Sequence, residues 1–258
     1  MLRKEMLIEQ FICRKDNFGT LIHDKKSGYT AAIDAPEGKS IHNMLKQHNW
    51  TLQFIFVTHH HHDHVEALAE LKKVYNATII GPEAESKKIA LLDYTLQPDE
   101  NFCFGTHTLA ALSTPGHTLG ALSYYFPQAN LLFAGDTLFS LGCGRLFEGT
   151  PLQMLTSLKK LRQLPDETIL YCGHEYTKTN ALFALTIDPQ NRKLHQRVEE
   201  VFLLRAQNAM TLPTTLGQEK DINPFLRWDD TILRKNLAME NATDEEVFAE
   251  IRKRKDHF

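Results

Sequence analysis

The chain has 258 residues, of which 42% are hydrophobic and 24% charged, with a formal net charge of −3. This composition is typical of a globular protein with one large domain, or one large and one small, and the acidic balance argues against a nucleic-acid partner. No apolar run approaches about 18 residues and segment 1–17 lacks the apolar core of a signal peptide, so we expect a cytoplasmic protein without a membrane partner.

Short apolar runs, each bounded by Gly, Pro, Asp or Asn, recur through the first two thirds of the chain. They predict strands at 6–13, 19–24, 29–34, 54–58, 77–81, 107–114, 121–126, 130–135 and 168–172. Helical periodicity predicts helices between them at 40–49, 64–75 and 151–164, the last opened by Thr150 and Pro151. Strands interleaved with a few helices indicate an α+β protein with two layers of sheet and helices outside them.

The character of the sequence changes near residue 175. Helices are predicted at 177–188 and 189–210, followed by a proline-containing break at 211–227. A last helix is opened by the capping-box pattern Thr243-x-x-Glu246. We therefore expect two domains, one at 1–173 and a helical one at 174–258, which the family resemblance given below implies to be catalytic and substrate-binding, respectively.

The segment FIFVTHHHHDHVEALAEL, residues 54–71, contains four consecutive histidines followed by Asp63 and His64. If the chain stays extended after the strand, His59 and His61 point to one side, and the two histidines at 60 and 62 point to the other. Asp63 and His64 would begin the following helix and face the same opening as the first pair. A bare histidine tract can also be a surface segment that binds metal nonspecifically, but this one continues an apolar strand and leads into an amphipathic helix.

Three later segments place a polar residue directly after a predicted strand. They are STPGHTLG with His117, FAGDTLFSLGCGR with Asp136, and YCGHEYT with His174. Each alone would more often be a turn or cap residue. Loops at strand ends commonly form sites over a rigid scaffold, so the four segments together indicate a metal site.

The order T-H-x-H-x-D-H, G-H-T, G-D-T and G-H-E resembles the metallo-β-lactamase superfamily. Within it, FAGDTLFSLGCGRLFEGTPLQM, YCGHEYT and the closing RKRKDHF resemble the glyoxalase II family, the hydroxyacylglutathione hydrolases. The resemblance implies an αββα sandwich and two divalent metal ions, with zinc expected and iron or manganese as alternatives. By position, His59, His61 and His117 would hold the first ion. Asp63, His64 and His174 would hold the second, and Asp136 would bridge the two.

The same resemblance implies hydrolysis of S-D-lactoylglutathione and related 2-hydroxyacyl thioesters to D-lactate and glutathione, the second step of methylglyoxal detoxification. A hydroxide bridging the metals would attack the thioester carbonyl, with Asp63 and Asp136 as catalytic residues. The residues expected to bind substrate are Arg145, Phe147, His174, Tyr176, Arg252 and Lys255. Both walls of the glutathione site would come from one chain, so we expect a monomer.

The sequence departs from the family pattern at two positions. Phe147 stands where many members have Tyr, which would remove one hydroxyl contact to glutathione. Glu66 lies where many superfamily members have glycine after the D-H pair. It could sit beside the metals or cap the first helical turn, and we expect the cap.

Other functions fit the sequence less well. A persulfide dioxygenase on the same fold would need one iron held by two His and a carboxylate, without the second ligand set. Many true β-lactamases carry Cys where Asp136 stands, a nuclease would need a basic clamp, and a binding module would be expected to have lost ligands. A Cys172–His174 nucleophile pair has no third orienting group.

Overall fold

The structure is a computed structural model that describes residues 5–258. Residues 1–4, which belong to the segment 1–17 that we expect not to be a signal peptide, lie outside the described residues. The chain forms two compact units, which are described separately. Unit 1 comprises Met1–Ser113 and Thr118–Gly135, and unit 2 comprises Thr114–His117 and Asp136–Phe258. The boundary expected after residue 173 stays a prediction. None of the described helices is both long and apolar enough to cross a bilayer.

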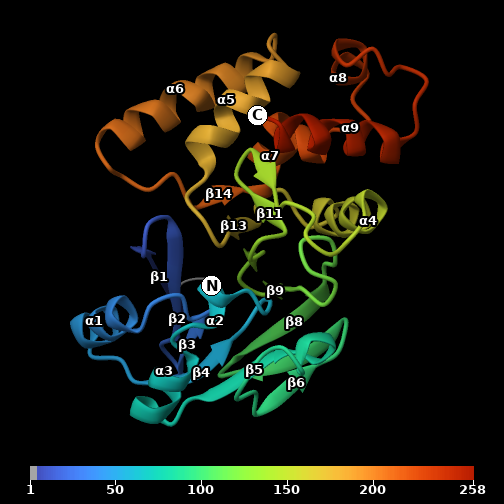
Figure 1. The fold of residues 1–258 in the computed structure, drawn as a ribbon. Coiled ribbons are helices and arrows are strands. Elements are labelled where there is room, and N and C mark those ends of the chain that lie inside the picture. Colours follow the sequence, from blue (N-terminus) through green and yellow to red (C-terminus); the bar gives the residue numbers. More distant parts are fainter. Residues whose placement is uncertain (1–4) are drawn as a thin grey trace. The chain divides into compact units, whose positions relative to one another are not determined.

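Unit 1 contains two sheets (Figure 1). The first has the strand order β1-β2-β3-β4-β5-β6, antiparallel from β1 to β3 and parallel from β3 to β6. Its elements are β1 (Met6–Cys13), β2 (Asn17–Asp24), β3 (Thr30–Ile33), α1 (Gly38–His48), β4 (Leu52–Phe56), α2 (His62–Val65), α3 (Leu68–Tyr75), β5 (Thr78–Pro82), the 3-10 turn η2 (Glu83–Glu85) and β6 (Tyr94–Leu96). The antiparallel order β10-β9-β8-β7 forms the second sheet in this unit, from β7 (Glu100–Phe104), β8 (His107–Ser113), β9 (Leu122–Phe126) and β10 (Leu131–Phe133).

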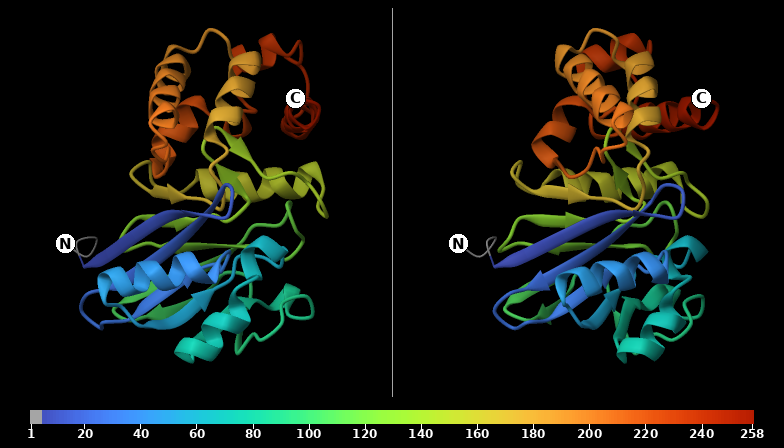
Figure 2. Two further views of the ribbon diagram at one scale, coloured as in Figure 1. Left: turned by 60° about the vertical axis from the view of Figure 1, so that its left-hand side comes forward. Right: turned by 90° about the vertical axis from the view of Figure 1, so that its left-hand side faces the viewer.

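Alternation along β4 explains how the first sheet is covered on both faces. Ile55 packs in a core with Ile41 of α1 and Leu71 of α3, so the two helices cover one face. Phe54 and Phe56 point the other way, as neighbours in a strand must. Their rings meet Phe102 and Phe104 of the second sheet, with ring centroids 5.5–6.1 Å apart. The predicted layers of sheet with helices outside are confirmed, and Figure 2 shows the two sheets of unit 1 stacked.

The helix expected at 64–75 is interrupted in the structure. Helix α2 ends at Val65 and α3 starts at Leu68. Two backbone hydrogen bonds to Ala35 lie at the break: the Ala35 N–H donates to the His64 carbonyl, and the Ala67 N–H donates to the Ala35 carbonyl. The prediction of one continuous helix was wrong because the loop after β3 takes backbone groups that an unbroken helix would use internally.

Unit 2 is largely helical (Figure 1). Leu141 packs in an apolar core with residues of the helices, among them Ala184, Leu194 and Ile222. The elements are β11 (Leu138–Phe139), β12 (Gly142–Cys143), α4 (Pro151–Arg162), β13 (Ile169–Tyr171), α5 (Thr177–Ile187), α6 (Arg192–Ala206), β14 (Thr214–Thr215), α7 (Leu216–Ile222), η3 (Pro224–Leu226), α8 (Thr231–Asn236) and α9 (Asp244–Asp256). The segment 211–227, expected as a break, contains β14, α7 and η3, because the Thr215 side chain accepts a hydrogen bond from the Gln218 N–H and starts a helix there.

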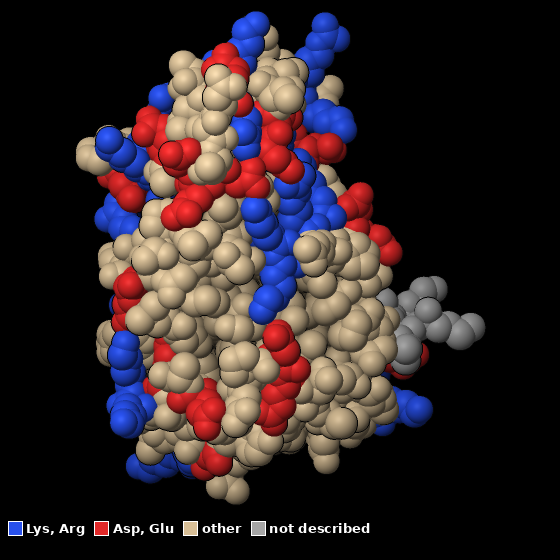
Figure 3. Space-filling view, turned by 90° about the vertical axis from the view of Figure 1, so that its right-hand side faces the viewer, with Lys and Arg blue, Asp and Glu red and all other residues tan. Residues whose placement is uncertain are grey.

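The surface of unit 2 carries ion pairs between α4 and the C-terminal segment. Lys159 Nζ lies 2.6 Å from Asp244 Oδ2, and Arg162 Nη1 lies 2.7 Å from Asp229 Oδ2. Basic side chains also lie beside acidic ones on the face drawn in Figure 3. Such mixing of charge is in keeping with a net charge of only −3.

Helix α9 begins with the predicted capping box. Thr243 Oγ1 accepts a hydrogen bond from the Glu246 N–H at 3.3 Å, and the Glu246 carboxylate accepts one from the Thr243 N–H at 2.7 Å. We expect Thr243→Ala to lower the free energy of unfolding by about 1 kcal/mol, because a helix donor loses its partner. Chemical denaturation measures this. Thr156→Ala is the control, since its hydroxyl donates only to Leu152 within α4; equal effects of the two changes would contradict the capping role.

Candidate metal centre

Three neighbouring parallel strands of unit 1 end beside the histidine run. Asp34 follows β3, Thr58 and His59 follow β4, and Glu85 lies shortly after β5. Because the carboxyl ends of parallel strands meet at one edge of a sheet, side chains from all three loops lie there. The Asp34 carboxylate accepts hydrogen bonds from the Thr58 N–H and hydroxyl at 2.7 and 2.8 Å, which ties the first two loops together.

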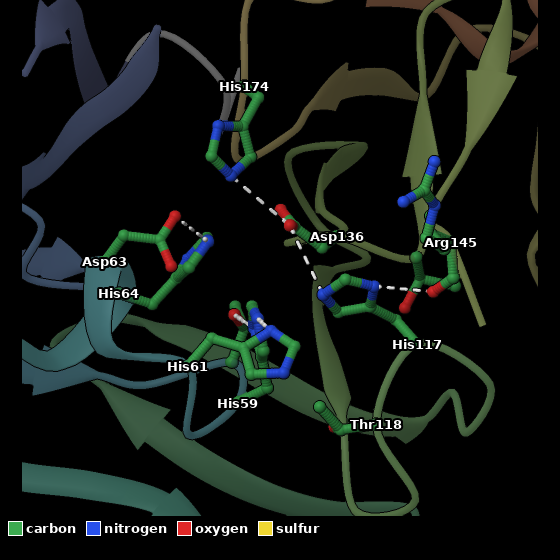
Figure 4. A network of polar contacts seen from close by, with 12 residues as sticks. His59, His61, Asp63, His64, His117, Thr118, Asp136, Arg145 and His174 are labelled. Carbon is green, nitrogen blue, oxygen red and sulfur yellow. Dashed lines mark hydrogen bonds and ion pairs between the residues drawn. The ribbon is translucent and has the colours of Figure 1, made fainter. Parts of the chain in front are cut away.

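The first group of candidate ligands, the first ligand group, lies at this edge and comprises His59, His61, Asp63 and His64 (Figure 4). His59 Nε2 lies 3.1 Å from His61 Nδ1, so the two rings turn toward each other. The His64 ring centroid lies 4.2 Å from that of His59, and His64 Nε2 lies 3.6 Å from Asp63 Oδ2. These four side chains therefore present nitrogen and oxygen donors close together.

The second group of candidate ligands, the second ligand group, lies in unit 2 and comprises His117, Asp136 and His174 (Figure 4). Asp136 Oδ2 lies 3.5 Å from His117 Nε2 and 3.3 Å from His174 Nε2. All three residues are at least 92% buried. The loop after Asp136 returns so closely that a Cβ on Gly144 would lie 1.9 Å from the Asp136 carbonyl oxygen, which requires glycine there.

Other groups hold the rings of both ligand groups in one orientation. His59 Nδ1 lies 3.0 Å from the Thr58 hydroxyl, and His64 Nδ1 lies 2.8 Å from Asp34 Oδ2. His117 Nδ1 lies 2.8 Å from the Arg145 carbonyl oxygen. In each of these three histidines Nδ1 has a polar partner, which leaves Nε2 as the nitrogen that can bind a metal ion. This arrangement is usual for histidines that bind metal.

The donor sets fit divalent metal ions. A tetrahedral ion with bonds of about 2.0–2.1 Å separates its donor atoms by about 3.3–3.4 Å. The distances from Asp136 Oδ2 to the two imidazole nitrogens, 3.3 and 3.5 Å, match this separation. Histidine nitrogens and carboxylate oxygens in this mixture suit Zn, Fe and Mn, and His and Asp of both groups are suited to binding a metal ion.

The two remaining histidines of the run have acidic partners outside the two ligand groups, although the His60 ring lies edge-on to that of His61 with centroids 5.0 Å apart. His60 turns to Glu85, with its Nδ1 2.9 Å from Glu85 Oε2. The His62 side chain is 78% exposed, and its Nε2 lies 3.7 Å from Glu66 Oε2. Glu66 is the C-cap residue of the one-turn helix α2, and its carboxylate forms an ion pair with Arg14.

Two aromatic residues expected to contact substrate lie against ligands of the second group. The Tyr176 ring stacks on His174, with centroids 4.6 Å apart and planes 6° from parallel. Phe147 places its ring edge-on to His117 at 5.2 Å and is 62% exposed. An exposed apolar ring beside a buried histidine can offer a surface to a substrate.

The basic residues expected to bind substrate lie on or near α9. Lys255 Nζ lies 5.2 Å above the Phe183 ring and 5.1 Å above the Phe258 ring. Arg252 is buried, and its guanidinium donates to the Cys143 carbonyl at 2.9 Å and to Asp256. Arg145 is exposed, with Nε 3.4 Å from Asp256 Oδ1.

The buried cysteines near these residues are not activated nucleophiles. Burial raises the pKa of the Cys143 thiol to about 11, and it raises that of Cys172 further above its ordinary value. The Cys172 thiol donates to the His174 carbonyl rather than facing the imidazole.

Four residues that sequence analysis did not single out contact the ligands or their neighbours. Asp34 and Thr58 orient His64 and His59, the amide of Asn17 donates to Asp63 Oδ2 at 2.9 Å, and Glu85 binds His60. Asp34 ends the predicted strand 29–34, so an acidic residue at a strand end was the available signal. Thr58 opens the pattern T-H-x-H-x-D-H, so its place beside His59 was also visible in the sequence, whereas Asn17 and Glu85 come close only through strand pairing.

Comparisons with known proteins find similar sequences over almost the whole chain. Residues 38–174 match the metallo-beta-lactamase superfamily, and residues 175–258 match the hydroxyacylglutathione hydrolase C-terminus. The chain is 81% identical to the hydroxyacylglutathione hydrolase of Bartonella quintana over 253 residues, which cover 98% of this chain and 100% of that protein. It is 56% identical to that of Brucella ovis over 257 residues, 100% of both chains.

Among solved structures, ETHE1 from Myxococcus xanthus is similar in fold. The TM-score is 0.69 at 23% sequence identity, over 96% of this chain and 90% of that chain. A metallo-beta-lactamase from Staphylococcus aureus gives a TM-score of 0.66 at 21% identity, over 97% of this chain and 73% of that one. At these identities the likeness shows the fold alone.

Proposed function

This chain belongs to the hydroxyacylglutathione hydrolase family of the metallo-beta-lactamase superfamily, and from that premise we propose that it hydrolyses S-D-lactoylglutathione and related S-2-hydroxyacylglutathiones. Water adds to the thioester carbonyl, the C–S bond breaks, and the products are D-lactate and glutathione. This is the second step of methylglyoxal detoxification. The main support is the full-length similarity to named hydroxyacylglutathione hydrolases.

We propose that the two ligand groups together hold two divalent metal ions. His59, His61 and His117 would bind one ion, Asp63, His64 and His174 would bind the other, and Asp136 would bridge them. Zinc is the ion proposed, and the mixed nitrogen and oxygen donors would also accept iron or manganese. When bound, such a pair supplies water activated at neutral pH and polarises the carbonyl.

The chain's own residues supply orientation. Polar partners bind Nδ1 of three imidazoles and leave Nε2 to bind a metal ion: Asp34 for His64, Thr58 for His59 and the Arg145 carbonyl for His117. Preorganised donors of this kind do not need to reorganise during the reaction. The glutathione thiol leaves readily, since a thiol pKa near 8.5 makes the thiolate a good leaving group.

Unit 2 supplies the proposed glutathione contacts. Lys255 provides a positive charge for the glycyl carboxylate, and exposed Arg145 adds a second one. Arg252 is also proposed to bind glutathione. Its guanidinium already donates to the Cys143 carbonyl and to Asp256, so it mainly stabilises the segment after β12 that leads to Arg145. Phe147 and Tyr176 contribute ring surfaces beside His117 and His174.

Loss of thioester absorbance on incubation with S-D-lactoylglutathione tests the function. We expect steady hydrolysis, abolished by a metal chelator and restored by added Zn²⁺. Two alternative substrates are tested separately: a β-lactam, and glutathione persulfide with the iron-loaded protein. Turnover of either alternative without thioester hydrolysis would contradict the proposal.

Two further properties are proposed with the function. Glutathione is a principal thiol of the reducing cytosol, which supports a cytoplasmic location. Because one chain carries both proposed ligand groups and the proposed glutathione contacts, a monomer suffices. Sedimentation at assay concentration would test the oligomeric state.

A further inference from the structure

Glu85 is a buried carboxylate that the proposed chemistry does not use. It ends the 3-10 turn η2, which directly follows β5, and it is only 1% exposed. Burying a carboxylate is unfavourable unless several hydrogen bonds compensate for the lost water. The partners of Glu85 are therefore informative about its role.

One oxygen of Glu85 binds the middle of the histidine run. Oε2 accepts a hydrogen bond from the His60 backbone N–H at 2.6 Å and lies 2.9 Å from His60 Nδ1. His60 stands between the ligands His59 and His61. The carboxylate thus anchors the peptide that joins two ligands, and it occupies Nδ1 of the intervening ring.

The other oxygen binds a segment distant in sequence. Oε1 accepts hydrogen bonds from the Thr118 hydroxyl and from the Gly120 N–H, the latter at 3.2 Å. A Cβ on Gly120 would lie 2.4 Å from Glu85 Cγ, so the close approach of this loop requires glycine. Thr118 directly follows His117, the first residue of the second ligand group.

We infer that Glu85 is a positioning residue for metal binding: its single carboxylate fixes the peptide between His59 and His61 and the segment that follows His117. The inference rests on the proposed function for the identity of the ligands. A carboxylate can accept about four hydrogen bonds, and here three donors and the His60 ring share its two oxygens. Removing it would take the acceptor from the buried Thr118 hydroxyl and from two half-buried N–H groups, and would leave both segments less restrained.

The experiment measures zinc affinity of the purified full-length chain by competition with a chromophoric chelator, without any turnover. We expect Glu85→Ala to weaken zinc binding about 10- to 100-fold, the range usual for residues that support metal ligands. Glu83→Ala is the matched control, because Glu83 lies in the same turn but is exposed. Its zinc affinity should equal that of the wild type.

Two conservative variants keep the inference testable if Glu85→Ala does not fold. Glu85→Gln retains one acceptor oxygen, and Thr118→Val removes one donor while keeping the shape of the side chain. Both should weaken zinc binding by less than Glu85→Ala and alter the visible spectrum of the Co²⁺-substituted protein, which reports ligand geometry. A structural role alone would lower the melting temperature without changing that spectrum.

The outcomes separate this inference from the proposed function. Folded Glu85 and Thr118 variants with wild-type zinc affinity and an unchanged Co²⁺ spectrum would overturn the positioning role and leave the proposed function intact. Wild-type protein that binds no zinc, iron or manganese would instead refute the metal centre itself.

Discussion

An Asp136→Ala variant is expected to lose about 10³-fold or more in kcat/KM for S-D-lactoylglutathione. Asp136 Oδ2 lies within 3.5 Å of the Nε2 atoms of both His117 and His174, so the change removes the one oxygen common to both. Loss of a single preorganised electrostatic contact already costs about 10²–10³ in rate. Loss of a ligand that bridges two ions should cost at least that much. Steady-state kinetics of the thioester assay measures the effect.

Asp166→Ala is the matched control for Asp136→Ala. Asp166 is also a carboxylate of unit 2, but its side chain is 74% exposed and pairs with Lys220. The control should retain wild-type kcat/KM. Activity of Asp136→Ala within about tenfold of wild type would refute the bridging role.

Lys255 is expected to make substrate affinity fall at alkaline pH. Burial, followed by the nearby charge of Arg252, lowers the pKa of Lys255 to about 8. Arg145 acts in the same direction, whereas Cys143 and Asp256 oppose it. A lysine is charged below its pKa, so the ammonium that we propose as the partner of the glycyl carboxylate is present at neutral pH and loses its charge as pH rises through 8. We expect kcat/KM to fall above about pH 8 while kcat stays level, because kcat/KM reports the free enzyme.

Substitutions at position 255 test this assignment. Lys255→Arg stays charged throughout and should abolish the loss of kcat/KM above pH 8. Lys255→Met should raise KM about 10- to 100-fold at pH 7, which corresponds to loss of one charge-assisted hydrogen bond. Lys253→Met, an exposed position on the same helix, is the control. An unchanged KM in Lys255→Met would reject the role.

Local patterns in the sequence predict most of the fold. Apolar runs with turn residues locate the strands, and Thr150 and Thr243 mark the starts of α4 and α9. Two features that the sequence did not predict are the break between α2 and α3 and the short helix α7. The break between α2 and α3 arises from backbone hydrogen bonds to Ala35, which no local pattern contains. Helix α7 was hidden by the prolines around it, although Thr215 supplies a cap.

The candidate ligands could be chosen from the sequence and their assignment to metal ions stays a prediction, whereas Asp34 and Glu85, which hold neighbouring groups, could not be placed beside them from the sequence. Alternation along an extended segment separates His59 and His61 from His60, and the structure places His60 against Glu85. Asp34 and Glu85 act from the ends of β3 and β5. Their proximity to the histidines follows from the parallel order β3-β4-β5, which is a property of strand pairing and not of any single segment.

Anomalous diffraction from crystals of the zinc-loaded protein would test the central claim most directly. The account predicts two zinc peaks per chain, about 3.5–4 Å apart. One peak should lie beside His59, His61 and His117, and the other beside Asp63, His64 and His174, with Asp136 touching both. A single peak, or ligand side chains that point away from a shared pair of ions, would contradict it.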